Sequence, residues 1–342
     1  SDLNAAKGLT ASEVESAFCL AIVETKEFNR DFARSVFTEK IQQVKKTGFL
    51  TYIPSDIKFS DVGGLSEIKH WILKRKNHYS PAARKFKLPF LKGIGLAGVP
   101  GCGKTLVSKA IASEFDCPLF ALDISKLFSK YVGGTEENFL EVIKTIESLG
   151  RCVILIDEVE KYLSEDATSG KSDTGASSRS FGSLLSWMSD RTGEALIVVT
   201  SNDYLKLPDA FTRKGRFNEW FWVDLPNSEE LTDIYNVVIK KYDRKVSEFD
   251  MDKLVSASKG FTGAEIDSIF VDAMTDVFAA AGEAGVVTTE AILAQAAVLF
   301  PQSKLEEAKI NKTRDAVFGK LKSASTPEKN VNQTQNPNTE LE

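Results

Sequence analysis

The chain has 342 residues, with 43 basic and 48 acidic side chains and a formal net charge of −5. Hydrophobic residues make up 42% and charged residues 27% of the sequence, which excludes a fully disordered chain, a collagen-like chain and a small disulfide-stapled protein. The acidic balance argues against a globally basic nucleic-acid-binding protein.

No segment predicts membrane insertion or secretion. The longest apolar runs, such as 153–156 and 195–199, are far shorter than the roughly 18 residues that a spanning helix needs. The polar start at Ser1 shows no signal-peptide pattern. The cysteines are Cys19, Cys102, Cys117 and Cys152, without a Cys-x-x-Cys pair. We interpret them as buried free thiols in a reducing compartment, and we expect a cytoplasmic protein.

In chain order, the first predicted elements are two helices within residues 11–47, where apolar residues recur at steps of three and four. They belong to an N-terminal helical element at 1–58. Residues 59–226 then alternate between short apolar runs and helical segments. The predicted strands are 93–97, 118–124, 152–156, 195–200 and 220–225. This alternation is typical of a buried parallel sheet with helices on both faces. The expected fold class is α/β, an αβα sandwich with a parallel five-stranded sheet.

Helical periodicity continues after the sheet without further strands. It predicts an all-helical domain at 227–300 and a C-terminal helix at 301–322. Residues 323–342 contain no aromatic residue and many Asn, Thr, Gln and Pro. That composition predicts a disordered tail.

A glycine-rich loop carries the strongest functional signal. The segment Gly98-Val99-Pro100-Gly101-Cys102-Gly103-Lys104-Thr105 matches G-x-x-x-x-G-K-[ST] in full, between a predicted strand and a predicted helix. Such a P-loop wraps its backbone N–H groups around phosphate. Lys104 would reach the β- and γ-phosphates of ATP, and the Thr105 hydroxyl would bind Mg²⁺. Cys102 is either a small residue that fills the turn, which we favour, or an oxidisable thiol whose pKa is lowered by Lys104.

A second motif predicts hydrolysis in addition to binding. Val153-Ile154-Leu155-Ile156-Asp157-Glu158 is an apolar strand that ends in two carboxylates. Strand alternation points the two carboxylates in different directions. Asp157 can therefore bind Mg²⁺ while Glu158 deprotonates a water that attacks the γ-phosphate.

These motifs resemble those of AAA ATPases over roughly residues 59–300. Asp61-Val62-Gly63-Gly64-Leu65 resembles the family segment that lies along the adenine, and Asn202 occupies the sensor-1 position. Gly260–Ile266 resembles the sensor-2 segment of the helical AAA lid, with Ala264 where other clades carry an arginine. The resemblance implies that the nucleotide is bound by Asp61, Gly63, Gly64, Pro100, Gly101, Cys102, Gly103, Lys104, Thr105, Leu106, Gly263 and Ala264.

Two further segments imply assembly and a client. Arg213 and Arg216 resemble the family's arginine fingers, which stabilise the phosphoryl group in a neighbouring subunit's site. By this likeness the active form is a homo-oligomeric ring, a hexamer. Lys130-Tyr131-Val132 lies where related ATPases place the first pore loop, which grips an extended polypeptide. The alternatives are solvated surface arginines and an ordinary core tyrosine.

Three segments narrow the resemblance: 45–50, 174–179, and 207–208 together with 213–217. They are similar to the chloroplast-open-reading-frame AAA ATPases of plastids and cyanobacteria and to their bacterial and phage relatives. Members of that subgroup usually have a longer N-terminal region, so this chain resembles a short or trimmed version. A plastid-encoded member would lie in the plastid stroma.

The function expected first is a ring-forming Mg-ATPase that remodels or threads a protein client. The lack of His-Glu-x-x-His and the presence of only two histidines exclude a self-contained metalloprotease. One alternative is a nucleic-acid motor, supported by Lys69–Lys92, which contains eight basic and no acidic residues. That stretch is also consistent with a solvated helix face. Another alternative is an ATP-dependent assembly scaffold, against which the intact catalytic set argues.

Overall fold

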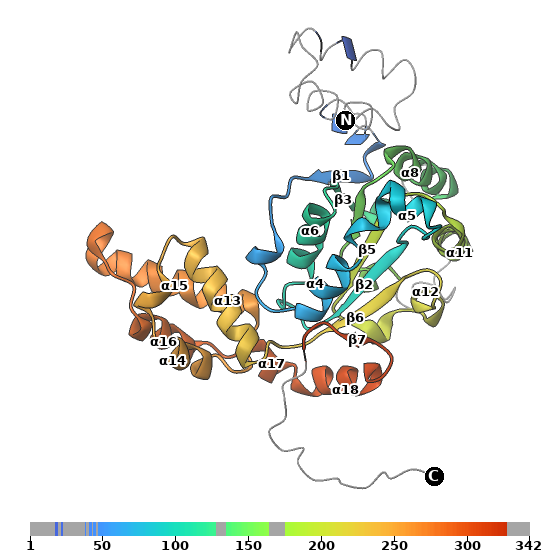
Figure 1. Ribbon diagram of the computed structural model, residues 1–342. Coiled ribbons are helices and arrows are strands. Elements are labelled where there is room, and N and C mark those ends of the chain that lie inside the picture. The colour runs from blue at the N-terminus through green and yellow to red at the C-terminus, as the bar shows by residue number, and fades with distance from the viewer. Residues whose placement is uncertain are drawn as a thin grey trace, which may run out of the picture.

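The computed structural model describes residues 47–127, 135–163 and 175–326, together with isolated positions between 18 and 45 (Figure 1). The isolated positions are helical, in agreement with the predicted N-terminal helices. The proposed pore-loop residues Lys130, Tyr131 and Val132 lie outside the described residues, as does the tail after Thr326.

The centre of the molecule is a seven-stranded sheet. Its five central strands run parallel and are hydrogen-bonded in the order β3 (Leu119–Leu122), β4 (Val153–Ile156), β5 (Leu196–Ser201), β2 (Gly93–Gly98) and β6 (Glu219–Val223). All five correspond to predicted strands, with ends that differ by up to two residues. The α/β fold class is therefore confirmed.

Two edge strands extend the sheet beyond the predicted five. On one edge β1 (Leu50–Ile53) pairs antiparallel with β3, and on the other β7 (Lys322–Ser323) pairs parallel with β6. The prediction of a disordered tail is wrong for 323–326, where Ala324 is fully buried. Both strands are too short to show a period of two in the sequence, and pairing with an existing sheet edge stabilises them.

Helices cover both faces of the sheet. One face is covered by α4 (Ser66–Leu73) and α6 (Lys104–Glu114), and the other by α7 (Ile124–Leu127), α8 (Thr135–Leu149), α11 (Gly175–Asp190), α12 (Asp209–Thr212) and α18 (Glu307–Val317). Side chains of β4 alternate between the two cores: Val153 and Leu155 face α4 and α6, whereas Ile154 and Ile156 face the other layer. Short elements connect these layers: η1 (Phe59–Asp61), η2 (Lys76–Tyr79), α5 (Pro81–Lys85), α9 (Glu160–Leu163) and η3 (Tyr204–Lys206).

After β6 the chain forms a separate helical cluster beside the sheet, the lid (Figure 1). It contains α13 (Ser228–Lys241), η4 (Val246–Glu248), α14 (Met251–Ala257), α15 (Gly263–Ala281), η5 (Gly282–Ala284) and α16 (Thr289–Val298). A core of its own, from Leu231 to Ala296, holds it together. Capping boxes fix the starts of α13, at Asn227 and Glu230, and of α15, at Thr262 and Glu265.

The segment after the lid returns to the sheet. The predicted helix at 301–322 consists of α17 (Gln302–Leu305) and α18, followed by a turn into β7. None of the helices in the described part of the chain has the length and hydrophobicity that a membrane-spanning segment needs.

Candidate active site

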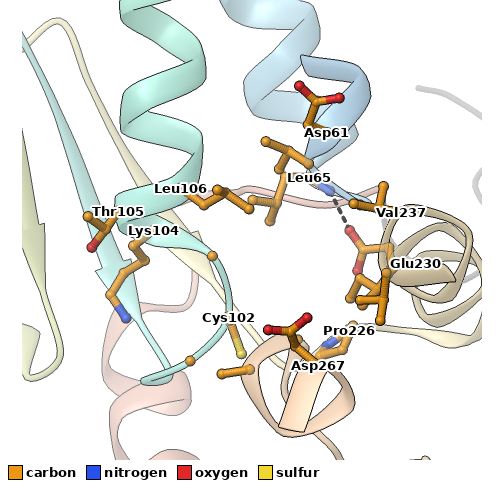
Figure 2. Close-up of a pocket in the computed structure, with 18 of the residues that line it drawn as sticks. Asp61, Leu65, Cys102, Lys104, Thr105, Leu106, Pro226, Glu230, Val237 and Asp267 are labelled. Atoms are coloured by element: carbon orange, nitrogen blue, oxygen red, sulfur yellow. Dashed lines mark hydrogen bonds between the residues drawn. The ribbon is translucent and has the colours of Figure 1, made fainter. Parts of the chain in front are cut away.

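The site forms where three neighbouring parallel strands end. Strands β4, β5 and β2 lie side by side, so the residues that follow them meet at one edge of the sheet. These are Asp157 and Glu158 after β4, Asn202 after β5, and the glycine-rich loop after β2. They line one pocket of about 890 Å³ that also includes residues of the lid. Figure 2 shows Lys104 and Thr105 on one side of this pocket and Glu230 and Val237 of the lid on the other.

The glycine-rich loop has the conformation that its sequence predicts. Gly101 has φ 77°, and a Cβ there would lie 2.9 Å from Thr262 Oγ1, so a larger residue would both strain the loop and push away the lid. The Lys104 side chain is buried, and Nζ donates 2.8 Å hydrogen bonds to the carbonyl oxygens of Gly98 and Val99. Burial lowers the pKa of Lys104 to about 8, although nearby carboxylates oppose this shift. A bound phosphate would favour the charged form.

An oxygen cluster lies beside the loop. Thr105 Oγ1 donates to both carboxylate oxygens of Asp157, at 3.2 and 3.1 Å. Thr200 Oγ1 donates to Asp157 Oδ1 from the neighbouring strand β5. A hydroxyl and a carboxylate are the hard oxygen ligands that Mg²⁺ prefers when phosphates and water supply its remaining positions. The residues predicted to bind the metal are therefore together and fit that ion.

Glu158 is held from three sides. Asn202 Nδ2 donates a 2.8 Å hydrogen bond to Glu158 Oε1, and Lys161 forms an ion pair with Oε2. The backbone N–H of Glu158 donates to Thr200 Oγ1 at 2.9 Å. Glu158 has φ 51°, a left-handed conformation that non-glycine residues rarely adopt and that functional sites often hold in place. The carboxylate is half-exposed and borders the pocket, as expected for a general base.

The segment predicted to lie along adenine packs against the lid. Leu65 N donates a 2.8 Å hydrogen bond to Glu230 Oε1, and a Cβ on Gly63 would lie 2.6 Å from the backbone of Ile234. Asp61 and Gly63 line the pocket, but Gly64 does not. Gly64 has φ 65° and packs against Glu230, and its role in nucleotide binding stays a prediction.

The sensor-2 segment meets the glycine-rich loop through the backbone. Ala264 N donates a 3.1 Å hydrogen bond to the carbonyl oxygen of Gly101, and both Gly263 and Ala264 line the pocket. No arginine is among the described residues that line it. At the position of Ala264 the lid therefore contacts the glycine-rich loop through its backbone.

Cys102 lines the pocket but is not an activated thiol. Burial raises its pKa to about 12, and the attraction of Lys104 is too weak to reverse this. The interpretation as an oxidisable thiol with a lowered pKa is therefore wrong. None of the four cysteines forms a disulfide; Cys152 is buried as expected, whereas Cys102 and Cys117 are half-buried and Cys19 is exposed.

The two predicted finger arginines lie away from their own pocket. Arg213 is exposed, with no hydrogen bond or ion pair to any described residue. Arg216 is half-buried; Nε donates to the carbonyl oxygen of Leu185 at 3.1 Å and a terminal nitrogen donates to that of Ala210. The two arginines therefore differ: Arg216 has a structural role within its own chain, and Arg213 has none in the described residues.

The basic stretch Lys69–Lys92 does not form a continuous free surface. Five of its eight cations contact their own chain: Lys69, Arg75, Lys76, Arg84 and Lys92. Lys76, for example, pairs with Glu114 at 2.6 Å. Lys74, Lys85 and Lys87 are exposed without a partner among the described residues. The structure therefore weakens the local support for a nucleic-acid motor.

Three site residues were not assigned roles from the sequence. Thr200 joins the two halves of the acidic motif, and its position at the end of a predicted strand was the available signal. Glu230 accepts a hydrogen bond from Leu65 in the segment predicted to lie along adenine. The available signal was the Asn227-x-x-Glu230 pattern, which is typical of a helix start. Asp224 lines the pocket at the end of β6, but a single acidic residue after a strand gives no specific signal.

Comparisons with known proteins identify a family model and relatives that match this chain. The profile described as "ATPase family associated with various cellular activities (AAA)" matches residues 94–225. Two relatives, both described as "Uncharacterized AAA domain-containing protein ycf46", come from Trieres chinensis and Guillardia theta. The first is 32% identical over 96% of this chain and 65% of its own length, and the second is 33% identical over 94% and 63%. The chain thus spans slightly less than two thirds of these relatives.

The fold comparison points the same way. The crystal structure of the FIGL-1 AAA domain in complex with ADP matches with a TM-score of 0.63 at 21% identity, over 84% of this chain and 98% of that one. At that identity the match supports the fold alone. The sequence matches lead to one conclusion: residues 94–225 form an AAA domain, and the chain is similar over most of its length to AAA domain-containing proteins.

Proposed function

We propose that the protein is a ring-forming AAA ATPase that uses the hydrolysis of Mg-ATP to remodel or thread a protein client. The observation that carries this proposal is a pocket with a general base, a metal-binding pair and a phosphate-binding lysine, but with no arginine among the described residues that line it.

Within the pocket each side chain has a distinct role. Lys104 and the loop backbone orient the phosphates, and Thr105 and Asp157 would hold Mg²⁺, which neutralises charge on the phosphates when bound. Glu158 accepts the proton of the attacking water. Asn202 fixes the direction of that carboxylate through its 2.8 Å hydrogen bond.

The lack of an arginine among the described lining residues supports assembly. Charge spreads over the transferring phosphoryl group in the transition state, and an arginine that reaches it raises turnover strongly. Arg213 is exposed and free of partners in the described part of its own chain, so it is available to a neighbouring copy. A ring in which each copy completes the next site follows, and a hexamer is our proposal by family likeness.

The client is proposed to be a polypeptide. Tyr131, with Lys130 and Val132, remains the proposed gripping residue by resemblance. The ring of a tyrosine offers a large, adaptable apolar area, so Tyr131 could grip an extended chain without sequence preference. A nucleic-acid client is the second candidate, but only three cations of the Lys69–Lys92 stretch remain unpaired in the described structure. We propose a cytoplasmic location, or the plastid stroma for a plastid-encoded protein.

The test uses Glu158→Gln, which should bind ATP without hydrolysing it. With ATP its mass should rise from 37.6 kDa for one chain to that of a closed ring, and the ring should retain a labelled, permanently unfolded polypeptide. Tyr131→Ala should abolish retention, whereas Tyr131→Phe should keep it. A single-chain mass at micromolar protein with ATP would contradict the ring, and retention of duplex DNA in place of the polypeptide would contradict the client.

A further inference from the structure

The lid is joined to the sheet at two places. The first connection, 224–227, leads from β6 into α13, and the second, 299–301, leads from α16 into α17. After the second connection the chain runs back beside β6 (Figure 1). Because the chain leaves the sheet at one connection and returns at the other, a rotation of the lid must bend both.

The returning helix α18 fastens itself to the first connection. Its residues Ile310 and Val317 are buried in the sheet's core. On the same helix Arg314 donates two 2.8 Å hydrogen bonds to Asp224, from Nε to Oδ2 and from a terminal nitrogen to Oδ1. Such two-pronged pairs are geometrically specific. Burial alone would raise the pKa of Asp224, but the hydrogen bonds from Arg314 and from Leu225 N outweigh it and lower that pKa.

The segment 322–326 then closes the attachment. Ala324 N donates to the carbonyl oxygen of Trp222 at 2.9 Å, and the carbonyl oxygen of Ala324 accepts hydrogen bonds from Glu67 N and Ile68 N at the start of α4. Those two N–H groups belong to the first turn of a helix and have no partner within it. Ala324 is therefore a cap for α4 as well as part of the sheet edge.

The returning chain contacts the lid at both connections, through Thr326 at the first and Gln302 at the second. Asn227 Nδ2, at the start of α13, donates to the carbonyl oxygen of Thr326 at 3.3 Å. At the other connection Gln302 N donates to Glu265 Oε1 at 2.7 Å. Glu265 lies next to Ala264, whose N–H contacts the glycine-rich loop. The two contacts thus end at the starts of α13 and α15, the lid helices that border the pocket.

We propose that residues 302–326, here named the C-terminal clamp, set the position of the lid over the nucleotide pocket, with Arg314 as a positioning residue that acts through Asp224. Asp224 lines the pocket and begins the first connection, so the pair fixes the axis about which the lid moves. Loss of the pair would depopulate the closed lid and weaken nucleotide binding by the same factor. This inference rests on the nucleotide-binding role of the pocket and goes beyond it.

Two amides report the lid's position directly. Leu65 N and Ala264 N each donate a hydrogen bond between the sheet domain and the lid. Their exchange with deuterated water, measured on the full chain without nucleotide, should accelerate in Arg314→Ala and less in Arg314→Lys. It should stay unchanged in Lys312→Ala, a control on an exposed position of the same helix. Because no nucleotide is present, this readout does not depend on ATP binding or hydrolysis.

The binding measurement completes the test. Arg314→Ala should raise the Kd for ADP about tenfold, with Arg314→Lys in between and Lys312→Ala unchanged. A chain ending at 321 should behave like Arg314→Ala, whereas a chain ending at 326 should behave like the full chain. If Arg314→Ala lowers Tm but leaves both amide exchange and Kd at the level of Lys312→Ala, the pair is merely structural and the proposal is wrong. Wild-type protein that fails to bind ADP while the exchange pattern holds would contradict the nucleotide site and leave the clamp supported.

Discussion

The side-chain amide of Asn202 holds Glu158 Oε1 at 2.8 Å, across the boundary between two neighbouring strands. Lys161 engages the other carboxylate oxygen, so both oxygens of the proposed general base are occupied. The hydrogen bond from Asn202 orients the carboxylate, and the ion pair with the exposed Lys161 is the weaker restraint because solvent screens it. A water can therefore replace Lys161 more easily than Asn202.

Glu158→Gln should separate binding from chemistry. The amide keeps the size of the side chain but cannot accept a proton, so kcat should fall by about 10² to 10⁴-fold while ATP affinity stays within about twofold. Steady-state turnover and equilibrium binding of a fluorescent ATP analogue measure the two quantities. Glu141→Gln, at an exposed position of α8, is the matched control and should change neither. Normal turnover in Glu158→Gln would show that another group is the base.

Thr200→Val should damage the site without altering its shape. The substitution removes the hydroxyl that donates to Asp157 and accepts from Glu158 N, and it leaves two polar partners without their hydrogen bond. Hydrogen bonds to charged groups of this kind correspond to roughly 10- to 100-fold in rate. We expect such a loss in kcat together with a higher Mg²⁺ requirement. Thr200→Ser retains the hydroxyl and should recover most of the activity; equal activity of the valine variant would remove Thr200 from the mechanism.

Cys102 should resist alkylation. Because its pKa is about 12 against an ordinary value of 9.0, its thiolate fraction near neutral pH is about 1000-fold smaller. The higher nucleophilicity of a more basic thiolate offsets part of this, so we expect iodoacetamide to react at least about 30-fold more slowly than with the unfolded chain. Raising the pH towards 12 should accelerate the reaction. Peptide mass spectrometry distinguishes Cys102 from exposed Cys19, and equal rates for the two thiols would contradict the burial of Cys102.

Local sequence predicted the central sheet and the phosphate side of the pocket. Strands such as Val153–Ile156 are buried on both faces, so their apolar runs are visible in the sequence, and Lys104, Thr105, Asp157 and Glu158 follow those runs directly. Parallel strands bring such residues to one edge whatever the details of packing. For that reason Thr105, Asp157 and Glu158, the proposed metal ligands and general base, lie together at this edge.

Contacts between distant segments were not predictable in the same way. Ala324 pairs with β6 and caps α4 more than 250 residues earlier in the chain, and no local pattern records such a partner. The local sequence likewise gives no sign that Arg314 and Asp224 form a pair. They meet only because the folded chain returns beside the first lid connection. The pKa of Cys102 depends on how deeply the folded chain buries it against the two cores of the sheet domain. The sequence indicated only the competing influence of Lys104 on that pKa.

In the proposed ring, neighbouring copies share one active site. Arg213→Ala and Glu158→Gln should each be inactive alone, the first for lack of a finger and the second for lack of a base. Arg213 is the better choice because Arg216 also bonds to Leu185 and Ala210 of its own chain.

Mixing the two inactive variants in equal amounts tests whether one copy can supply the arginine to the site of its neighbour. In random rings about one quarter of the sites pair an intact Glu158 with a neighbour's intact Arg213. If neighbouring copies share a site, the mixture should regain ATP turnover towards that fraction of the wild-type rate. A mixture as inactive as its two components, or full turnover by Arg213→Ala alone, would contradict the shared site.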